Sequence, residues 1–164
     1  MAVLPFDQRD GFIWMNGQLV PWKDAKLHVL SHGLHYASSV FEGERAYGGE
    51  IFKCTEHSER LKRSGQILDF EIPYSVAEID AAKRLIVEKN GMENCYVRAI
   101  AWRGSEQLGV TAMSNTIHLA IANWEWPSYF DPAQRLKGIR LDLAEYRRLL
   151  RDGGLRKDGG GFGA

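Results

Sequence analysis

The chain has 164 residues, of which 45% are hydrophobic and 26% are charged. These proportions predict one packed globular domain and argue against a disordered chain. Lysine plus arginine number 21, as do aspartate plus glutamate, so the formal net charge is zero and a charge-driven partner such as nucleic acid or an anionic membrane is not indicated.

Two hairpins are predicted in the first third of the chain. The stretch "FIWMNGQLVPW" (12–22) places Asn16-Gly17 between two short apolar runs, and this pair readily adopts the positive φ angles of a tight hairpin turn. The stretch "VFEGERAYGGEIF" (40–52) has Gly48-Gly49 in the same position.

Two helices follow the hairpins. The first is expected to begin with Thr55 as its cap, with Leu61, Ile67 and Leu68 near one face. The second covers "SVAEIDAAKRLIVEKNG" (75–91), where Ser75 and Glu78 form a capping box and Asn90-Gly91 ends the helix. Its apolar stripe consists of Val76, Ile79, Ala82 and Ile86.

Three strands are predicted after the helices: "CYVRAIAW" (95–102), "TIHLAIANW" (116–124) and "IRLDLAEY" (139–146). Strands and helices therefore come in blocks, which predicts an α+β fold with helices packed on a mainly antiparallel sheet. The composition changes abruptly after Arg148, and six of the last 12 residues are glycine.

The cysteines and the start of the chain indicate a cytoplasmic protein. Cys54 and Cys95 have neither metal-ligand spacing nor partners for a disulfide framework, so buried thiols in a reducing compartment are expected. The first residues show no signal-peptide pattern, and no apolar run approaches the roughly 20 residues that a membrane span needs.

Three histidines in "HVLSHGLHYASS" raise the possibility of a metal site. His28, His32 and His35 would share one face of a helix, but no carboxylate or thiolate accompanies them in a metal-binding pattern. We therefore expect no metal and interpret them as core and supporting histidines.

Tyr96 and Arg98 are two residues apart and would lie on the same face of a strand. A phenol beside a guanidinium can hold a carboxylate, although a pair on a sheet surface without a ligand is the alternative that periodicity favours. Further aromatic residues in "NWEWPSYF" lie beside acidic residues, which disfavours nucleic-acid stacking and favours an apolar pocket wall. The glycine-rich end lacks the Gly-Lys-Ser/Thr of a phosphate-binding loop.

Taken together, these motifs resemble the N-terminal domain of branched-chain amino acid aminotransferases, which are class IV pyridoxal-phosphate enzymes. The resemblance covers residues 12–148 and rests on "WMNGQLVPWKDAKLHVLSHGLHYASSVFEGERAY", "EHSERL", "YVRAIAW" and "GIRLDLAEYRR", in that order. It implies the smaller, first domain of a fold-type IV enzyme over residues 1–148. The implied activity is reversible transamination between leucine, isoleucine or valine and 2-oxoglutarate with pyridoxal 5'-phosphate.

The resemblance also implies roles for individual residues. Arg60 corresponds to the arginine that binds the cofactor phosphate, and Val110 to a loop residue that reaches a neighbouring subunit in a homo-oligomer. The residues that correspond to the substrate pocket are Tyr36, Phe41, Gly43, Arg45, Tyr96, Arg98, Val110, Trp126 and Tyr129.

The last residues depart from the family pattern. The lysine that holds the cofactor is expected near position 159, which is Gly159, after a proline-containing linker, but Leu149 and Leu150 follow Arg148. Residues 149–164 are therefore expected to be an aberrant or disordered tail, from an out-of-frame or prematurely ended reading of the gene. The lysine-bearing second domain is expected to be absent and the chain inactive alone. The alternatives are a non-catalytic fragment that pairs with an intact subunit and another class IV activity, D-amino acid transamination or aminodeoxychorismate lysis.

Overall fold

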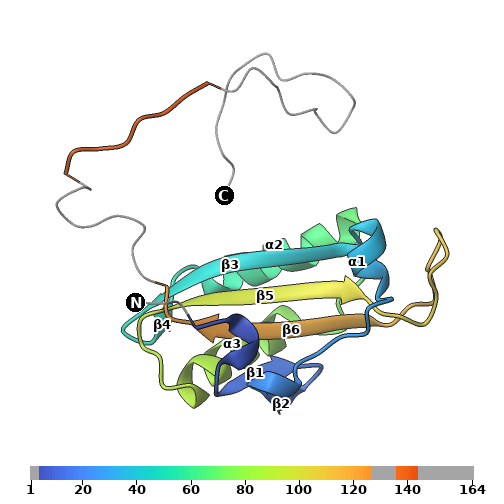
Figure 1. Cartoon of the computed structure of the whole chain (residues 1–164), viewed down its shortest axis with the longest axis horizontal. Helices are drawn as coiled ribbons and strands as arrows, with labels where there is room; N and C mark the ends of the chain where they lie inside the picture. The colour runs from blue at the N-terminus through green and yellow to red at the C-terminus, as the bar shows by residue number, and fades with distance from the viewer. Residues whose placement is uncertain (1–3, 127–135, 144–164) are drawn as a thin grey trace. The chain divides into compact units, whose positions relative to one another are not determined.

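The computed structural model describes residues 4–126 and 136–143 (Figure 1). The chain divides into two units, Met1–Trp126 and Pro127–Ala164. All helices and strands described below belong to the first unit.

A six-stranded antiparallel sheet forms the first unit, with the strand order β2-β1-β6-β5-β3-β4. The strands are β1 (Phe12–Met15), β2 (Gln18–Pro21), β3 (Ser39–Tyr47), β4 (Glu50–Ile51), β5 (Cys95–Arg103) and β6 (Ile117–Trp124). The helices are α1 (His32–Tyr36), α2 (Cys54–Ile67) and α3 (Val76–Lys89), with short 3-10 turns η1 (Phe6–Gln8) and η2 (Trp22–Asp24). The predicted antiparallel α+β fold is confirmed.

Both predicted hairpins are present. Asn16 and Gly17 have φ angles of 52° and 90° and connect β1 to β2, while Gly48 and Gly49 connect β3 to β4. Positive φ at both central positions matches the right-handed twist of the strands, which explains why these dipeptides predict hairpins so directly.

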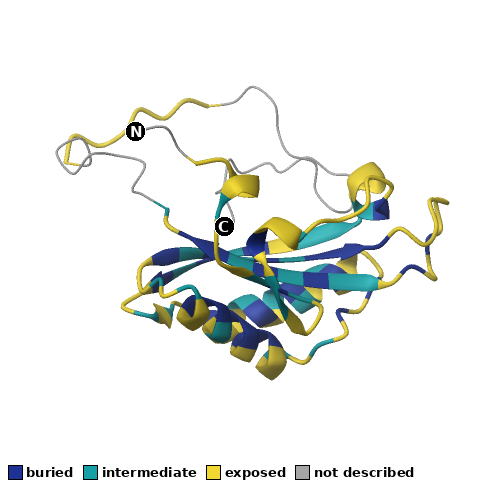
Figure 2. Ribbon diagram, turned by 60° about the horizontal axis from the view of Figure 1, so that its bottom comes forward, coloured by how far each residue is buried: buried dark blue, intermediate teal, exposed yellow. Residues whose placement is uncertain are grey.

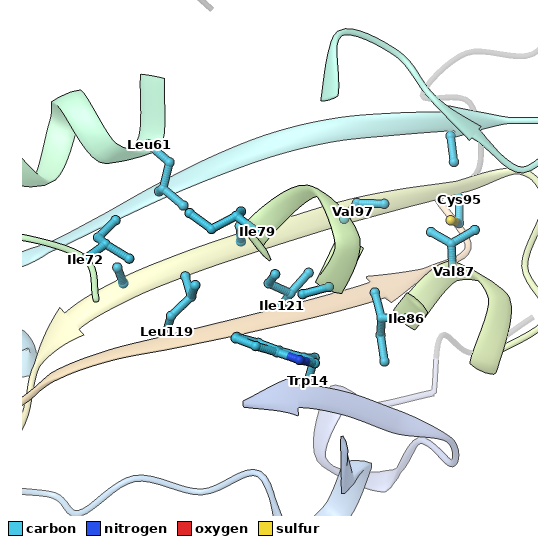
Figure 3. Close-up of a cluster of buried hydrophobic side chains, with 14 of the residues drawn as sticks. Trp14, Leu61, Ile72, Ile79, Ile86, Val87, Cys95, Val97, Leu119 and Ile121 are labelled. Carbon is cyan, nitrogen blue, oxygen red and sulfur yellow. The ribbon is translucent and has the colours of Figure 1, made fainter. Parts of the chain in front are cut away.

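The two long helices lie side by side on one face of the sheet (Figure 2). Their apolar side chains and those of the strands form one core, in which Leu61, Ile79, Ile86, Val97 and Ile121 are fully buried (Figure 3). Every second residue of β3, β5 and β6 points into this core, and the alternate residues point to the opposite face, which α2 and α3 do not cover.

The start and end of α2 differ from the prediction. The helix begins at Cys54 after Lys53, which has a φ of 56°, and the Thr55 hydroxyl binds Asp80 of α3 instead of capping α2. Ile67 and Leu68 are exposed, because the chain leaves the helix there and turns toward Phe70.

Residues 139–143 form no strand, contrary to the prediction for "IRLDLAEY". Alternating apolar residues make a half-buried strand only when a neighbouring strand and a core receive them, and within 136–143 Leu136, Leu141 and Leu143 are exposed. Residues 144–146 of that prediction, and the predicted tail 149–164, lie outside the described residues.

The predicted capping box of α3 is confirmed. The Ser75 hydroxyl accepts a hydrogen bond from the Glu78 amide at 3.2 Å, and the Glu78 carboxylate accepts one from the Ser75 amide at 2.7 Å. Both bonds satisfy amides that the helix itself leaves without acceptors.

Replacing Ser75 by Ala is expected to lower the free energy of unfolding by about 1 kcal/mol. The loss follows from the missing acceptor at the first turn of α3, and urea unfolding followed by circular dichroism measures it. Ser105→Ala, at an exposed loop serine with no role in a cap, is the control. Equal stability of the two variants would contradict the assigned cap.

Candidate functional site

The sheet face opposite α2 and α3 collects most of the residues predicted for the substrate pocket. Phe41, Gly43 and Arg45 alternate along β3 and point to this face. Tyr96 and Arg98 of β5 lie directly across from Arg45 and Gly43, respectively, in the strand register. The period of two in the sequence therefore brings residues from two distant segments into one cluster.

Tyr96 and Arg98 contact each other as predicted. Nε and Nη2 of Arg98 donate to the Tyr96 hydroxyl oxygen at 3.1 and 2.8 Å, and the guanidinium carbon lies 4.1 Å from the centre of the Phe41 ring. The guanidinium is thus held between a phenol and an aromatic face, an arrangement that leaves little freedom to its side chain. A pre-oriented guanidinium beside a hydroxyl suits a carboxylate ligand.

Gly43 is required by the position of Tyr96. A Cβ atom at Gly43 would overlap the Tyr96 hydroxyl and lie 3.0 Å from its Cζ. The phenol therefore rests directly on the backbone of β3, where only glycine leaves room for it.

Trp126 and Arg45 form the end of the cluster. Nη1 of Arg45 donates to the Trp126 carbonyl oxygen at 2.9 Å, and the Trp126 ring lies 5.0 Å from that of Tyr96. Trp124, one of the aromatic residues for which an apolar pocket wall was predicted, lies 4.9 Å from Tyr96 between ring centres, on the same face. The strand register places it there, since Trp124 pairs with Tyr96.

A hollow of about 230 Å³ continues from Arg98 along the same sheet face. Its floor consists of side chains of β1, β5 and β6, such as Ile100 and Trp102, and segment 25–34 forms its wall. Apart from Arg98 and Lys26 its lining carries no charge, so the hollow is a mostly apolar space with two cationic side chains in its lining.

Two predicted pocket residues lie outside this cluster. Tyr36, at the end of α1, stacks on His32 with a centroid distance of 4.5 Å. Val110 projects from the loop between β5 and β6 and is 82% exposed. Tyr129 and Gly159, the position of the expected lysine, lie outside the described residues.

The three histidines do not form the shared helical face that would make a metal site. Only His32 and His35 fall in α1, and His32 is buried, with Nδ1 2.6 Å from the Ser38 hydroxyl and Nε2 3.0 Å from the Gly109 carbonyl oxygen. Within residues 4–126 and 136–143, no group of three or more His, Cys, Asp or Glu side chains could hold a metal ion.

Arg60 lies on α2 and binds Glu42, which points from β3 toward the helices. Its Nε donates to Glu42 Oε1 at 2.6 Å and its Nη2 to Oε2 at 2.7 Å, while His57 Nδ1 lies 2.8 Å from Oε2. Burial alone would raise the pKa of Glu42, but the bonds from Arg60 and His57 outweigh it and hold that pKa below 4.5. Neither Glu42 nor His57 was assigned a role from the sequence.

Lys53, Glu56, His57 and Arg60 line a second hollow of about 230 Å³ beside α2. Two cations and an imidazole around one hollow are donors that suit a phosphate group, although Lys53 is paired with the Glu56 carboxylate of the same lining at 2.5 Å. The predicted position of Arg60 as a phosphate ligand therefore fits the chemistry of its surroundings.

The pKa of Glu42 predicts a pH dependence of stability. A carboxyl group whose pKa is lower in the folded than in the unfolded state stabilises the folded protein. This stabilisation is complete at a pH above the pKa of the unfolded state, and it is lost as the pH falls through the pKa of the folded state. The Glu42→Gln variant is therefore expected to be less stable than the parent at pH 7, and the difference should shrink below about pH 4.5. Urea unfolding between pH 7 and pH 3 measures this, with Glu88→Gln, at an exposed position of α3, as the control. A difference that is independent of pH would contradict the assigned role of the Glu42 charge.

Residues 39–152 match the model of the amino-transferase class IV family. The chain belongs to the class IV aminotransferase family. Among its relatives are a probable branched-chain-amino-acid aminotransferase of Rickettsia felis, 41% identical over 93% of this chain, and the branched-chain-amino-acid aminotransferase of Pseudomonas aeruginosa, 42% identical over 85%. The chain spans about half the length of these relatives, 51% and 47% respectively.

Solved structures of class IV aminotransferases share the fold. The Escherichia coli branched-chain amino acid aminotransferase superposes with a TM-score of 0.71 at 36% identity, over 76% of this chain and 42% of that one. The T.th. branched-chain amino acid aminotransferase with pyridoxamine 5'-phosphate gives the same TM-score at 42% identity, over 76% of this chain and 43% of that one. The fold is that of the smaller N-terminal domain of these enzymes.

No helix in the described parts of this class IV chain has the length and apolar character to cross a membrane.

Proposed function

We propose that this chain provides the first-domain half of a pyridoxal-phosphate site that transaminates branched-chain L-amino acids with 2-oxoglutarate. The observation that carries the proposal is the cluster of Phe41, Gly43, Tyr96 and Arg98, in which a fixed guanidinium and phenol adjoin an apolar hollow. A carboxylate on Arg98 and Tyr96 would leave a branched aliphatic chain against apolar walls. Relatives with branched-chain names in two organisms support the same substrate class.

Arg60 is proposed to hold the phosphate of the cofactor in the hollow that it lines with Lys53 and His57. When bound, pyridoxal phosphate supplies the electron sink that transamination requires. The contribution of the residues described here is to bind and orient: Arg60 the phosphate, Arg98 with Tyr96 a carboxylate, and Phe41 with Trp126 the apolar part of the substrate.

The substrate half of the proposal can be tested with 4-methylvaleric acid, which is bound in a solved structure of the T.th. enzyme. Adding it to the 164-residue chain should change tryptophan fluorescence, because Trp124 and Trp126 contact Tyr96. Arg98→Ala is expected to weaken binding about tenfold or more, since a charge-assisted pair contributes about 1.5–3 kcal/mol. Arg63→Ala, at an exposed arginine of α2, is the control, and equal affinities of the two variants would overturn the proposal.

The 164-residue chain on its own is proposed not to turn over leucine and 2-oxoglutarate, because glycine occupies the position at which the family's lysine is expected. Glutamate formation in the presence of added cofactor measures this, and any turnover that borohydride abolishes by trapping the cofactor on a lysine would contradict it.

A second candidate function is association with another aminotransferase subunit. The supporting observation is the loop between β5 and β6, in which Val110 is 82% exposed and Met113 is 65% exposed. The side chains of Arg103 and Asn115 hold this loop in place by donating hydrogen bonds to its backbone carbonyl oxygens. Two exposed apolar side chains on a fixed loop favour a partner surface. Co-purification of the chain with an intact class IV aminotransferase tests this, and a failure to co-purify would count against it.

A further inference from the structure

Glu42 occupies a position between the two proposed binding regions. Its neighbours in β3, Phe41 and Gly43, point to the substrate face, whereas the Glu42 side chain points to the helices and is 4% exposed. A buried carboxylate is costly unless its oxygens are bound by charged or polar donors. Here both oxygens are bound by side chains of α2.

The geometry of these contacts fixes the Arg60 guanidinium. Nε and Nη2 each donate to a different oxygen of Glu42, at 2.6 and 2.7 Å, so two parallel bonds define the plane and the rotation of the group. His57 Nδ1 reaches Oε2 at 2.8 Å and therefore carries the hydrogen that donates there. The 3.3 Å approach of Arg60 Nη2 to the same His57 nitrogen is then a contact between two donors and adds no bond.

Two effects of Glu42 on an anion at Arg60 oppose each other. Its negative charge lowers the local positive potential, which weakens anion binding. Its two bonds hold a long side chain in one orientation, which removes an entropic cost that binding would otherwise carry. Because Lys53 and Arg60 already line the hollow, the contribution that Glu42 adds is the orientation of Arg60 through these two bonds.

We propose that Glu42, supported by His57, is a positioning residue that orients Arg60 for the phosphate of the bound cofactor. The inference rests on the proposed function, in which Arg60 binds that phosphate. Strand β3 then has two roles. Phe41 and Gly43 form part of the substrate site on one face of the sheet, and Glu42 orients the phosphate ligand Arg60 on the other.

The test is a titration of the 164-residue chain with inorganic phosphate, followed by the NMR signal of the Arg60 Nε–H group. Glu42→Gln removes the charge and replaces one of the two acceptor oxygens with an NH2 donor, whereas Glu42→Asp keeps the charge but is one methylene too short to accept from both Nε and Nη2 of Arg60. Both variants are expected to weaken phosphate binding about tenfold. This is the lower end of the loss of affinity seen at metal sites when a residue that orients a metal ligand is replaced. Glu59→Gln removes a negative charge from an exposed position of α2 that does not line the hollow, and it should leave the affinity unchanged.

The outcomes separate the inference from the proposed function. If Arg60→Ala binds phosphate as the parent does, or the parent does not bind it, Arg60 is not the phosphate ligand and both the cofactor proposal and the inference fail. If Arg60→Ala loses binding while Glu42→Asp matches the parent, or Glu42→Gln binds more tightly, the positioning role alone is overturned. A measurement on the parent guards against variants that do not fold: the Arg60 Nε–H signal should sharpen and shift with the ionisation of Glu42, and an unresponsive signal would overturn the positioning role.

Discussion

Replacing Lys83 by Met is expected to lower the free energy of unfolding by about 3–5 kcal/mol, the cost of leaving one partner of a buried ion pair without the other. Lys83 of α3 and Glu44 of β3 are both fully buried, and their charged atoms Nζ and Oε1 are 2.6 Å apart. The Glu44 carboxylate oxygens have no hydrogen-bond donor in ideal geometry among the described residues, so the charge of Lys83 is the main compensation for their burial. Urea unfolding followed by circular dichroism measures the loss.

The pH dependence of this variant tests its cause. Burial raises the pKa of Glu44, although Lys83 opposes the shift, and without Lys83 that pKa should rise further. A carboxyl with a raised folded pKa destabilises the fold as the pH rises above the unfolded value, so the deficit of Lys83→Met should be smaller at pH 4 than at pH 7.

Two further variants complete the comparison. The double variant Lys83→Met/Glu44→Leu is expected to regain most of the stability, because apolar side chains of similar volume replace a buried pair at little cost. Lys89→Met, at an exposed position of the same helix, is the matched control. A double variant as unstable as Lys83→Met would contradict the role assigned to the unpaired carboxylate.

Features that depend on neighbours in the sequence were predictable. The turns at Asn16-Gly17 and Gly48-Gly49 and the capping box at Ser75 are confirmed, because each is determined by a few adjacent residues. The predicted strand "IRLDLAEY" is wrong over residues 139–143. The alternation of apolar and polar residues indicates which face a strand would bury, but it does not show whether a partner strand is present.

Part of the candidate site could also be predicted from residues close together in the sequence. Tyr96 and Arg98 share a face because side chains of a strand alternate, which a sequence shows directly. The contact of Arg98 with Phe41 depends on the pairing of β3 with β5, which two helices separate in the sequence. The family resemblance placed both residues in one pocket, but the contact itself was not predicted.

The charged residues on the helix-facing side were missed for a different reason. Glu42, Glu44 and Lys83 resemble solvated surface charges, the usual fate of such residues. A signal was nevertheless present: Lys83 is four residues after Ile79 and three before Ile86, so it falls within the apolar face of α3. A lysine at such a position requires a buried anion, and Glu44 on β3 provides it.

Replacing Gly43 by Ala is expected to have the largest effect on the substrate face. The new Cβ would overlap the Tyr96 hydroxyl and would lie 3.0 Å from the Tyr96 Cζ. A small shift of the Tyr96 ring cannot relieve both contacts. Tyr96 must therefore move, which breaks its bonds from Arg98 and its packing on Trp126. We expect a loss of about 1–3 kcal/mol in the free energy of unfolding, as for overpacked sites, and a loss of 4-methylvaleric acid binding of at least about tenfold.

Gly109→Ala is the matched control, because a Cβ at Gly109 meets no atom within 4 Å. The variant pair separates crowding from any general cost of adding a methyl group to a glycine. The Tyr96→Ala background adds a sharper comparison: with the ring absent, Gly43→Ala should cost little further stability, so the two substitutions should couple by at least about 1 kcal/mol. Two results would contradict this arrangement: additive losses of unfolding free energy in the double variant, or an unchanged affinity of Gly43→Ala for 4-methylvaleric acid. Either would show that Tyr96 does not pack on the backbone of β3 at the substrate site.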